Sequence, residues 1–241
     1  MIQVSRIAKV LSLAASLLGM GGYARAQTVR PVVAELGNPA KGRVEYVNNA
    51  ITPLNVVLEA KSFTVSETGE IAYRALDPNV HLKLSATSFR IQPQQTYYVF
   101  YEASTEAAPA WFVIYAAFSG FPFRTQQGMN VRVELPHTVY LLPKQSLQKE
   151  QVQVKRAEFH PESNKVLVEV ENTGEVFGRV LETSINYRKK KEDGPGFPVF
   201  PHSRRIMEIA LEDNDGGKNI PERVELSFQN FKLEEKLRAS P

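Results

Sequence analysis

The chain has 241 residues, with 29 Lys and Arg, 26 Asp and Glu, and no cysteine. The lack of cysteine excludes disulfides and thiol chemistry, so hydrophobic cores alone must stabilise the fold. The net charge of +3 comes from residues 1–26, which hold three basic residues and no acid, so the rest of the chain is neutral. A neutral chain gives no reason to expect a nucleic-acid partner.

Residues 1–26 have the pattern of a cleavable export signal. Arg6 and Lys9 form a positive region before an apolar run at residues 10–20, which is too short to span a bilayer comfortably. Ala24 and Ala26 match the small-x-small cleavage pattern, and we predict cleavage before Gln27, with no membrane insertion afterwards. An uncleaved anchor is the alternative. An exported protein without cysteine fits a bacterial periplasm or surface better than a eukaryotic secretory pathway.

Short segments with alternating apolar residues follow one another through the first half of the remaining chain. Side chains of a strand alternate between its two faces, so such segments predict strands. Pro31 places the first of them at a sheet edge. Two strongly aromatic segments, residues 96–102 and 109–118, are expected at the centre of the first core. The predicted strands before residue 129 are 28–36, 42–48, 54–63, 82–84, 89–91, 96–102 and 109–118, with a polar connection at 64–79.

The stretch at residues 129–144 closes the first module and is the candidate working surface. Its alternation predicts a strand with one apolar face. Pro136 removes one backbone donor, which puts the strand at a sheet edge or bends it there. The apolar face has two readings, because it can fill its own core or be offered to a partner. Its residues are Val131, Val133, Leu135 and, beyond the proline, Val139.

A second series of alternating segments begins after a polar stretch at residues 145–150. Many short strands at this spacing, with weak helical periodicity, predict an all-β protein made of sandwiches. We therefore expect one domain at 27–144, a linker at 145–150, a second domain at 151–234 and a polar tail at 235–241. The predicted strands are 152–159, 165–171, 177–187, 204–211 and 222–231, with a charged hairpin tip at 188–196.

The sequence contains few residues in patterns typical of catalysis or metal binding. Its four histidines are far apart in predicted turns or strand ends, and no nucleophile, zinc or phosphate-loop motif is present. Residues 213–217 (DNDGG) do not have the spacing of a calcium loop and predict a polar connection. We expect no enzyme activity, cofactor or metal. The histidines are His81, His137, His160 and His202.

Five short motifs lie in order along the two predicted domains, at residues 88–93 (SFRIQP), 111–115 (WFVIY), 139–144 (VYLLPK), 170–173 (VENT) and 200–203 (FPHS). Together they resemble the PapD-like periplasmic chaperones of chaperone–usher pilus assembly. In the first domain, residues 88–93 (SFRIQP) are similar to the family's Phe-Arg-Leu-x-Pro strand start, and residues 111–115 (WFVIY) to its aromatic strand. Residues 139–144 resemble the hydrophobic end of its first domain. In the second domain, residues 170–173 (VENT) resemble a strand end and residues 200–203 (FPHS) a turn. The resemblance implies two immunoglobulin-like β-sandwich domains in tandem.

The resemblance also implies a function, the binding and stabilising of a pilin-like fibre subunit for delivery to an outer-membrane usher. In the family, the chaperone lends the last strand of its first domain to a subunit that lacks one, which is β-strand addition with side-chain pockets. By position, the lending residues of this chain would be Val131, Val133, Leu135 and Val139. The sequence leaves open whether two free copies cap each other's exposed edge strands in a dimer.

One feature of the family is missing. It anchors the subunit's terminal carboxylate with an arginine on the first strand and a lysine on the lending strand. This chain has Val33 at the first position and Val139 or Tyr140 at the second. The missing pair supports an alternative, an exported immunoglobulin-like binding or surface-structural module without chaperone activity. The basic residues that a register shift would bring to this place are Arg30, Arg132 and Lys144.

Overall fold

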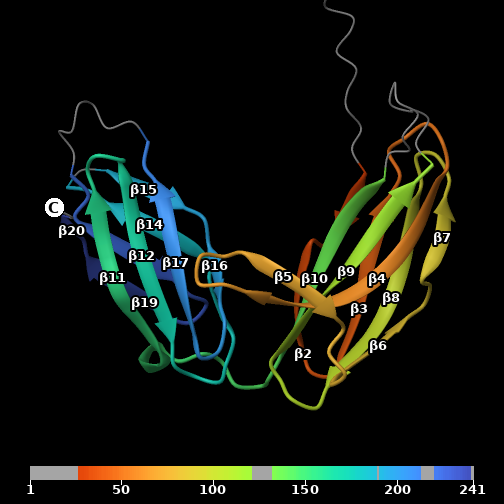
Figure 1. The fold of residues 1–241 in the computed structure, drawn as a ribbon, viewed down its shortest axis with the longest axis horizontal. Helices are drawn as coiled ribbons and strands as arrows, with labels where there is room; N and C mark the ends of the chain where they lie inside the picture. Colours follow the sequence, from red (N-terminus) through yellow and green to blue (C-terminus); the bar gives the residue numbers. More distant parts are fainter. Residues whose placement is uncertain (1–26, 121–131, 189, 213–219, 240–241) are drawn as a thin grey trace, which may run out of the picture.

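The computed structural model describes residues 27–120, 132–188, 190–212 and 220–239. Two β-sandwich lobes are joined at one end and splay apart from that junction (Figure 1). This arrangement confirms the expected all-β class with two sandwiches in tandem. The expected export signal lies outside the described residues. Within the residues described, no helix is long and apolar enough to cross a membrane.

The first lobe packs two sheets face to face. Its strands are β1 (Thr28–Arg30), β2 (Val33–Gly37), β3 (Ala40–Val47), β4 (Leu54–Val65), β5 (Ile71–Ala75), β6 (Val80–Leu84), β7 (Ser88–Ile91), β8 (Thr96–Thr105), β9 (Ala110–Ser119) and β10 (Val133–Leu142). One sheet has the order β1-β3-β8-β6 and the other β2-β10-β9-β4-β5, with β7 beside β4. Alternate side chains of both sheets fill the space between them, and Tyr46, Phe112 and Phe118 are fully buried there.

Two expectations for this lobe need correction. The single strand predicted at 28–36 is divided at Pro31 into β1 and β2, which belong to different sheets. Proline cannot donate to a ladder, so the chain changes sheets at this residue. The connection at 64–79 contains β5, which forms a hairpin with the end of β4. All residues of β5 are exposed, so it has no alternation between an apolar and a polar face.

The second lobe is built in the same way. Its elements are the 3-10 turn η1 (Lys149–Gln151) and the strands β11 (Val152–His160), β12 (Lys165–Asn172), β13 (Gly178–Val180), β14 (Glu182–Asn186), β15 (Lys191–Gly194), β16 (Phe197–Val199), β17 (Ser203–Ala210), β18 (Arg223–Ser227), β19 (Lys232–Lys236) and β20 (Arg238–Ala239). The sheets have the orders β17-β12-β11-β20 and β15-β14-β18-β19, with β13 and β16 as a separate pair. A second hydrophobic core lies between them.

The strand predicted at 177–187 is interrupted at Leu181, because β13 pairs with β16 whereas β14 pairs with β15 and β18. The hairpin tip is shorter than expected, since β15 already pairs with β14. Leu147, in the expected linker, is buried in the second core. Leu237 is buried there too, and β20 pairs with β11. Residues expected as a polar tail therefore belong to the fold as far as residue 239.

Candidate functional site

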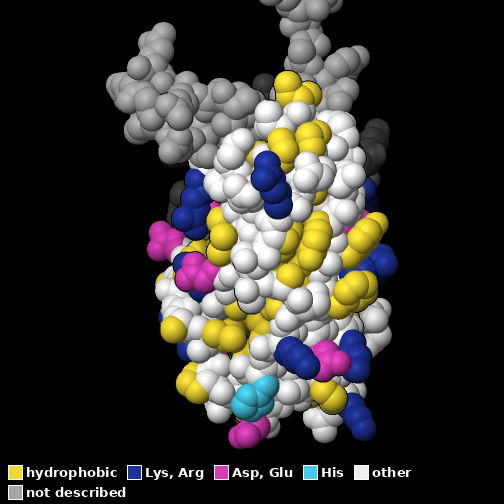
Figure 2. Space-filling model, turned by 90° about the vertical axis from the view of Figure 1, so that its right-hand side faces the viewer, with side chains coloured by type: hydrophobic (Ala, Val, Ile, Leu, Met, Phe, Trp, Pro, Cys, Tyr) yellow, Lys and Arg dark blue, Asp and Glu magenta, His cyan; other side chains and the backbone are white. Residues whose placement is uncertain are grey.

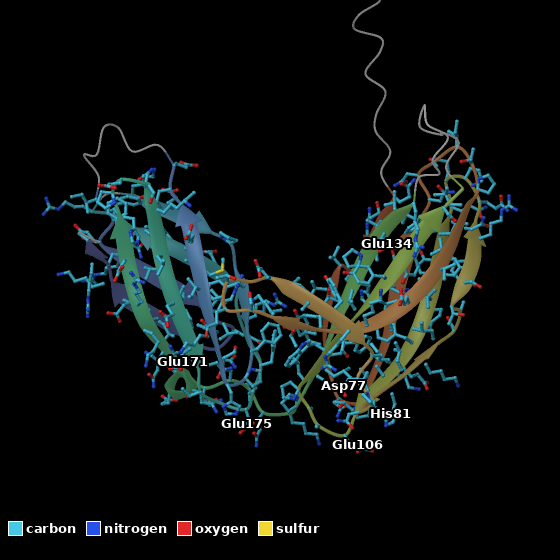
Figure 3. The ribbon with its side chains drawn as sticks, in the orientation of Figure 1. Asp77, His81, Glu106, Glu134, Glu171 and Glu175 are labelled. Atoms are coloured by element: carbon cyan, nitrogen blue, oxygen red, sulfur yellow. The ribbon has the colours of Figure 1, made fainter. Side chains whose placement is uncertain are left out.

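Strand β10 has two different sides. Along its length it pairs with β9 in antiparallel register. On the other side, β2 pairs with it only from Thr138 to Leu142, and the Thr138 N–H donates to the Val32 carbonyl at 2.8 Å. Residues 133–137 have no strand partner on that side within the described part of the chain. This free edge lies at the end of the lobe far from the junction, where Figure 3 shows Glu134.

The backbone groups of the free edge follow from the alternation of a strand. Because the Thr138 N–H points away from β9, the N–H and C=O groups two and four residues earlier point the same way. Glu134 thus presents one donor and one acceptor to the free edge, and Pro136 presents an acceptor only. The N–H that Pro136 lacks would point to this free edge and not to β9. The pairing of Pro136 with Tyr115 on β9 therefore loses no hydrogen bond of the ladder. The edge position expected from Pro136 is confirmed.

The apolar face of β10 points toward the first core. Val133 and Leu135 are half-buried and pack against that core from its rim. Val139 is fully buried in it, at 0% exposure, so it is a core residue and is not offered at the surface. Val131 lies outside the described residues. Of the four residues expected to be lent to a partner, Val133 and Leu135 are the two that combine partial exposure with the free edge.

His137 also faces this core, in the middle of β10 and not in a turn or at a strand end as the sequence suggested. Its Nδ1 lies 2.7 Å from the Pro31 carbonyl, and its Nε2 lies 3.1 Å from the Tyr101 hydroxyl. A carbonyl only accepts, so Nδ1–H donates to Pro31 and Nε2 accepts from Tyr101. Burial lowers the pKa of His137 and raises the pKa of Tyr101 to about 12. The neutral imidazole thus ties the β1–β2 connection and β8 to β10.

The other face of β10 meets the second lobe. Tyr140 packs with Phe177 at 4.5 Å between ring centroids, and Trp111 packs with Phe200 at 4.7 Å. The Trp111 indole N–H donates to the Phe63 carbonyl at 2.8 Å. These rings form an interdomain cluster of their own, distinct from the two cores. The strand around Trp111 was expected at the centre of the first core. One face of it lies there, whereas its alternate side chains reach the second lobe.

The three expected carboxylate anchors are not brought together. Arg30 is exposed and lies opposite Glu45 in the outer sheet. Arg132 pairs with Glu134 at 2.9 Å, just before the start of β10. Lys144 is exposed beyond the other end of this strand. Twelve residues of extended chain separate Arg132 from Lys144, which is about 40 Å, so the two cannot share one carboxylate.

Where the resemblance implies a lysine on the lending strand, the first lobe has an aromatic side chain, and its neighbour on β2 is acidic. Tyr140 lies opposite Glu35 on β2. Glu35 pairs with Arg179 of the second lobe. The Arg179 guanidinium lies 5.2 Å from the centroid of the Tyr140 ring. The ion pair and the stacked ring therefore fill this part of the junction with contacts made by the chain itself.

The β4–β5 hairpin makes a second connection between the lobes. It reaches from the first lobe across to β16 and β17 (Figure 1). At its tip, the Glu67 carbonyl accepts the Ile206 N–H at 2.7 Å and Nη1 of Arg205 at 3.1 Å. The lobes are thus held at the linker, through the aromatic cluster and at this tip. No sequence signal pointed to this contact, because the hairpin carries no apolar alternation.

The side of the first lobe that faces away from the second also carries apolar groups. Figure 2 shows them as a band with charged side chains around it. Tyr98 and Phe100 on β8 are 45% and 58% exposed, and the Arg43 guanidinium covers the Tyr98 ring at 5.1 Å. At the lower end of this lobe lie Asp77 and His81 (Figure 3). In the part of the chain that the structure describes, no three metal-ligating side chains are gathered. The loop at 213–217 lies outside that part.

Comparison with known proteins identifies the fold. No family model matches the chain, and no curated protein matches it in sequence. Solved structures do match, and several of them are fimbrial chaperones. The YadV chaperone has a TM-score of 0.55 at 10% identity, over 88% of this chain and 99% of that chain. The SafB chaperone complex with SafA pilin from Salmonella enterica gives 0.55 at 9% identity, over 88% and 96%. The Pseudomonas aeruginosa CupB2 chaperone gives 0.51 at 12% identity, over 88% and 100%.

This chain therefore has the fold of the PapD-like chaperones, two immunoglobulin-like β-sandwiches in tandem. The likeness spans both lobes and nearly the full length of each chaperone. The fold implied by the sequence motifs is thus confirmed, although this chain is only 10% and 9% identical in sequence to the YadV and SafB chaperone structures.

Proposed function

We propose that this protein is an exported chaperone that binds a fibre subunit by lending it the free edge of β10. The observation that carries the proposal is the edge at residues 133–137. It combines backbone groups without a strand partner in the described structure with two half-buried apolar side chains, Val133 and Leu135. The edge stands in a two-sandwich fold shared with fimbrial chaperones. The client is a pilin-like subunit, as in the SafA pilin complex.

The mechanism is strand addition. A client strand that lies along the free edge exchanges hydrogen bonds with Glu134 and donates one to the Pro136 carbonyl. Val133 and Leu135 enter the client's own core. Complete burial of such side chains contributes about 1.5–3 kcal/mol each, and less here because both are already half-buried. Ordering of the client offsets part of this gain.

Further parts of the proposal rest on the fold and the sequence together. The chaperone acts in the periplasm after cleavage of residues 1–26, and it delivers the subunit to an outer-membrane usher. In the free protein, the exposed edge of β10 is capped by the same edge of a second copy, because an unpaired edge readily adds a strand.

One observation favours a different function. Tyr140, which stands where the resemblance implies a lysine, lies against the Arg179 guanidinium, and Arg179 pairs with Glu35. A module that only attaches to an exported surface or fibre does not need to hold and release a subunit. Such a protein would co-purify with the assembled fibre and would not protect a free subunit from degradation.

Capture of the client tests the proposal. The tagged protein is used to isolate partners from a periplasmic extract of its host, as the wild type and as Val133→Glu. We expect the wild type alone to retain a small exported β-protein, because a charge at this position cannot enter an apolar groove. Leu181→Glu is the control, since Leu181 is 57% exposed in the second lobe. This variant should retain the client as the wild type does. Equal capture by the wild type and Val133→Glu would remove the proposed site.

A further inference from the structure

One tyrosine crosses the first core to reach the strand that carries the free edge. Tyr101 lies on β8, in the sheet β1-β3-β8-β6, and is buried. Its ring centroid is 5.5 Å from that of His137 on β10, in the opposite sheet, and its hydroxyl donates to His137 Nε2. In the same core the Tyr46 hydroxyl is buried without a hydrogen-bond partner among the described residues. Polar partners are thus scarce in this core, and the bond to His137 fixes where the Tyr101 ring lies.

The space for this ring is left by Gly42 on β3. Gly42 lies directly opposite Tyr101 in the ladder, and it alternates with the buried residues Ala40 and Val44 on the inward face. A Cβ at residue 42 would overlap Cζ and the hydroxyl oxygen of Tyr101. The backbone of Gly42 does not have a positive φ, so its conformation is open to other residues. The need for glycine at this position therefore comes from the end of the Tyr101 ring that binds His137.

His137 connects this ring to the free edge. It is the last residue of the segment 133–137, which has β9 as its strand partner on one side and no strand partner on the other within the described chain. Val133 and Leu135 hold this segment by apolar packing, which has no preferred direction. The two hydrogen bonds of the buried imidazole, to Tyr101 and to the Pro31 carbonyl, are directional. They fix the end of the free edge relative to the opposite sheet.

We propose that Gly42 and Tyr101 are positioning residues for the free edge of β10 and act on it through His137. The glycine admits the ring, the hydroxyl of the ring holds the imidazole, and the imidazole holds β10. A strand edge that is already in place spares the ordering cost that a client would otherwise have to meet on binding. This inference deepens the proposed function. It rests on that function for the effect on a client, and not for the effect on the free protein.

NMR of the free protein tests the positioning without any client. The nitrogen chemical shift of His137 Nε2 reports whether this atom accepts a hydrogen bond, and the order parameters of the Glu134 and Leu135 amides report how firmly the edge is held. We expect Gly42→Ala to move the Nε2 signal toward that of an unbonded nitrogen and to lower both order parameters. Gly37→Ala should change neither, because nothing lies within 4 Å of a Cβ at that position. An unchanged Nε2 signal, or unchanged order of the two amides, in Gly42→Ala would overturn the proposal.

A double variant separates this route from general strain in β3. Tyr101→Phe keeps the ring but removes the hydroxyl, so His137 Nε2 has already lost its donor. Gly42→Ala added to Tyr101→Phe should therefore leave the Nε2 signal where Tyr101→Phe alone puts it, since coupled residues have non-additive effects. A further shift would show that residue 42 acts on His137 by another route. Tyr101→Phe should also lower the order of the Glu134 amide by itself, and wild-type order there would contradict the proposal even if Gly42→Ala does not fold.

Client binding then shows whether the positioning matters for the proposed function. Gly42→Ala and Tyr101→Phe should each bind the β-protein captured by the wild type about tenfold more weakly, because the edge must first be ordered. Gly37→Ala should bind it as tightly as the wild type does. Wild-type affinity in the first two variants would overturn the role in client binding. If Val133→Glu captured the client as well as the wild type, the proposed function would fail, and the NMR signals of the free protein would still decide whether Gly42 and Tyr101 position the edge.

Discussion

The imidazole of His137 accepts a hydrogen bond of 3.1 Å from the Tyr101 hydroxyl inside the first core. Its other nitrogen donates to the Pro31 carbonyl, at the point where the chain passes from one sheet to the other. The strand that carries the proposed binding edge is therefore tied by one buried side chain to both sheets of its sandwich. This tie positions the free end of β10, and because burial lowers the pKa of His137, we expect acid to weaken the tie.

Acid should destabilise the first lobe through His137. Burial outweighs the contact with the Pro31 carbonyl and lowers the pKa of His137 below its ordinary 6.5. The unfolded chain thus binds a proton more readily than the native state, so stability is complete above pH 6.5 and falls as the pH drops through that value. Urea unfolding between pH 8 and pH 5 checks this. His137→Gln should lose less stability over this range than the wild type, and equal losses would show that another group is responsible.

Removal of the Tyr101 hydroxyl should leave the imidazole without its donor. We expect Tyr101→Phe to lower the free energy of unfolding by about 1–3 kcal/mol at pH 7.5, the cost of an unsatisfied buried acceptor. Tyr98→Phe is the matched control, because Tyr98 is 45% exposed, and its effect should stay within about 0.5 kcal/mol. Urea unfolding measures both. Similar values for the two variants would contradict the buried hydrogen bond.

The interdomain cluster should be visible in fluorescence. Trp111 is the only tryptophan in the chain, and its ring packs against Phe200 of the second lobe. Phe200→Ala should shift the tryptophan emission to longer wavelength and cost about 3 kcal/mol in unfolding free energy. Phe100→Ala makes the same substitution at a residue that is 58% exposed on the far side of the first lobe. It should change neither quantity, and an unchanged spectrum in Phe200→Ala would argue against contact between the lobes.

The hairpin tip should not tolerate a side chain at residue 69. Gly69 has φ +96° and lies directly against the Arg205 guanidinium. Gly69→Ala should cost about 1–3 kcal/mol through backbone strain, and it should displace Arg205. Gly37→Ala is the control, because nothing lies within 4 Å of a Cβ at that position. Urea unfolding together with the Arg205 Nε–H signal tests this. An unchanged Nε–H signal in Gly69→Ala would show that the tip does not hold the arginine.

Proline substitution should distinguish the two sides of β10. The Glu134 N–H points to the free edge and the Leu135 N–H to β9, where Leu135 lies opposite Ala116. Leu135→Pro removes a ladder bond and should cost about 3 kcal/mol or more. Glu134→Pro removes only a donor that a client would use, so it should unfold much nearer to the wild type and yet fail to capture the client. Reversed stabilities would mean that the register of β10 is different.

The sequence was most informative where one face of a strand is buried. The alternation around Val133 and the donor lost at Pro136 located β10 and its edge, because both depend on local backbone geometry alone. It was least informative where contacts join distant segments. β5 is exposed on both faces, so its hairpin with β4 left no periodic signal. The approach of Arg205 to Glu67 spans 138 residues and depends on how two lobes dock, which no local pattern encodes.

Amide hydrogen exchange at Glu134 reports directly on whether a client strand pairs with the free edge of β10. This N–H should exchange quickly in the free monomer, since it points to the free edge, and it should become strongly protected when the captured client is added. The Leu135 N–H, directed to β9, should be protected in both states. Unchanged exchange of the Glu134 N–H in a complex with bound client would show that the client binds elsewhere and would contradict strand addition at β10.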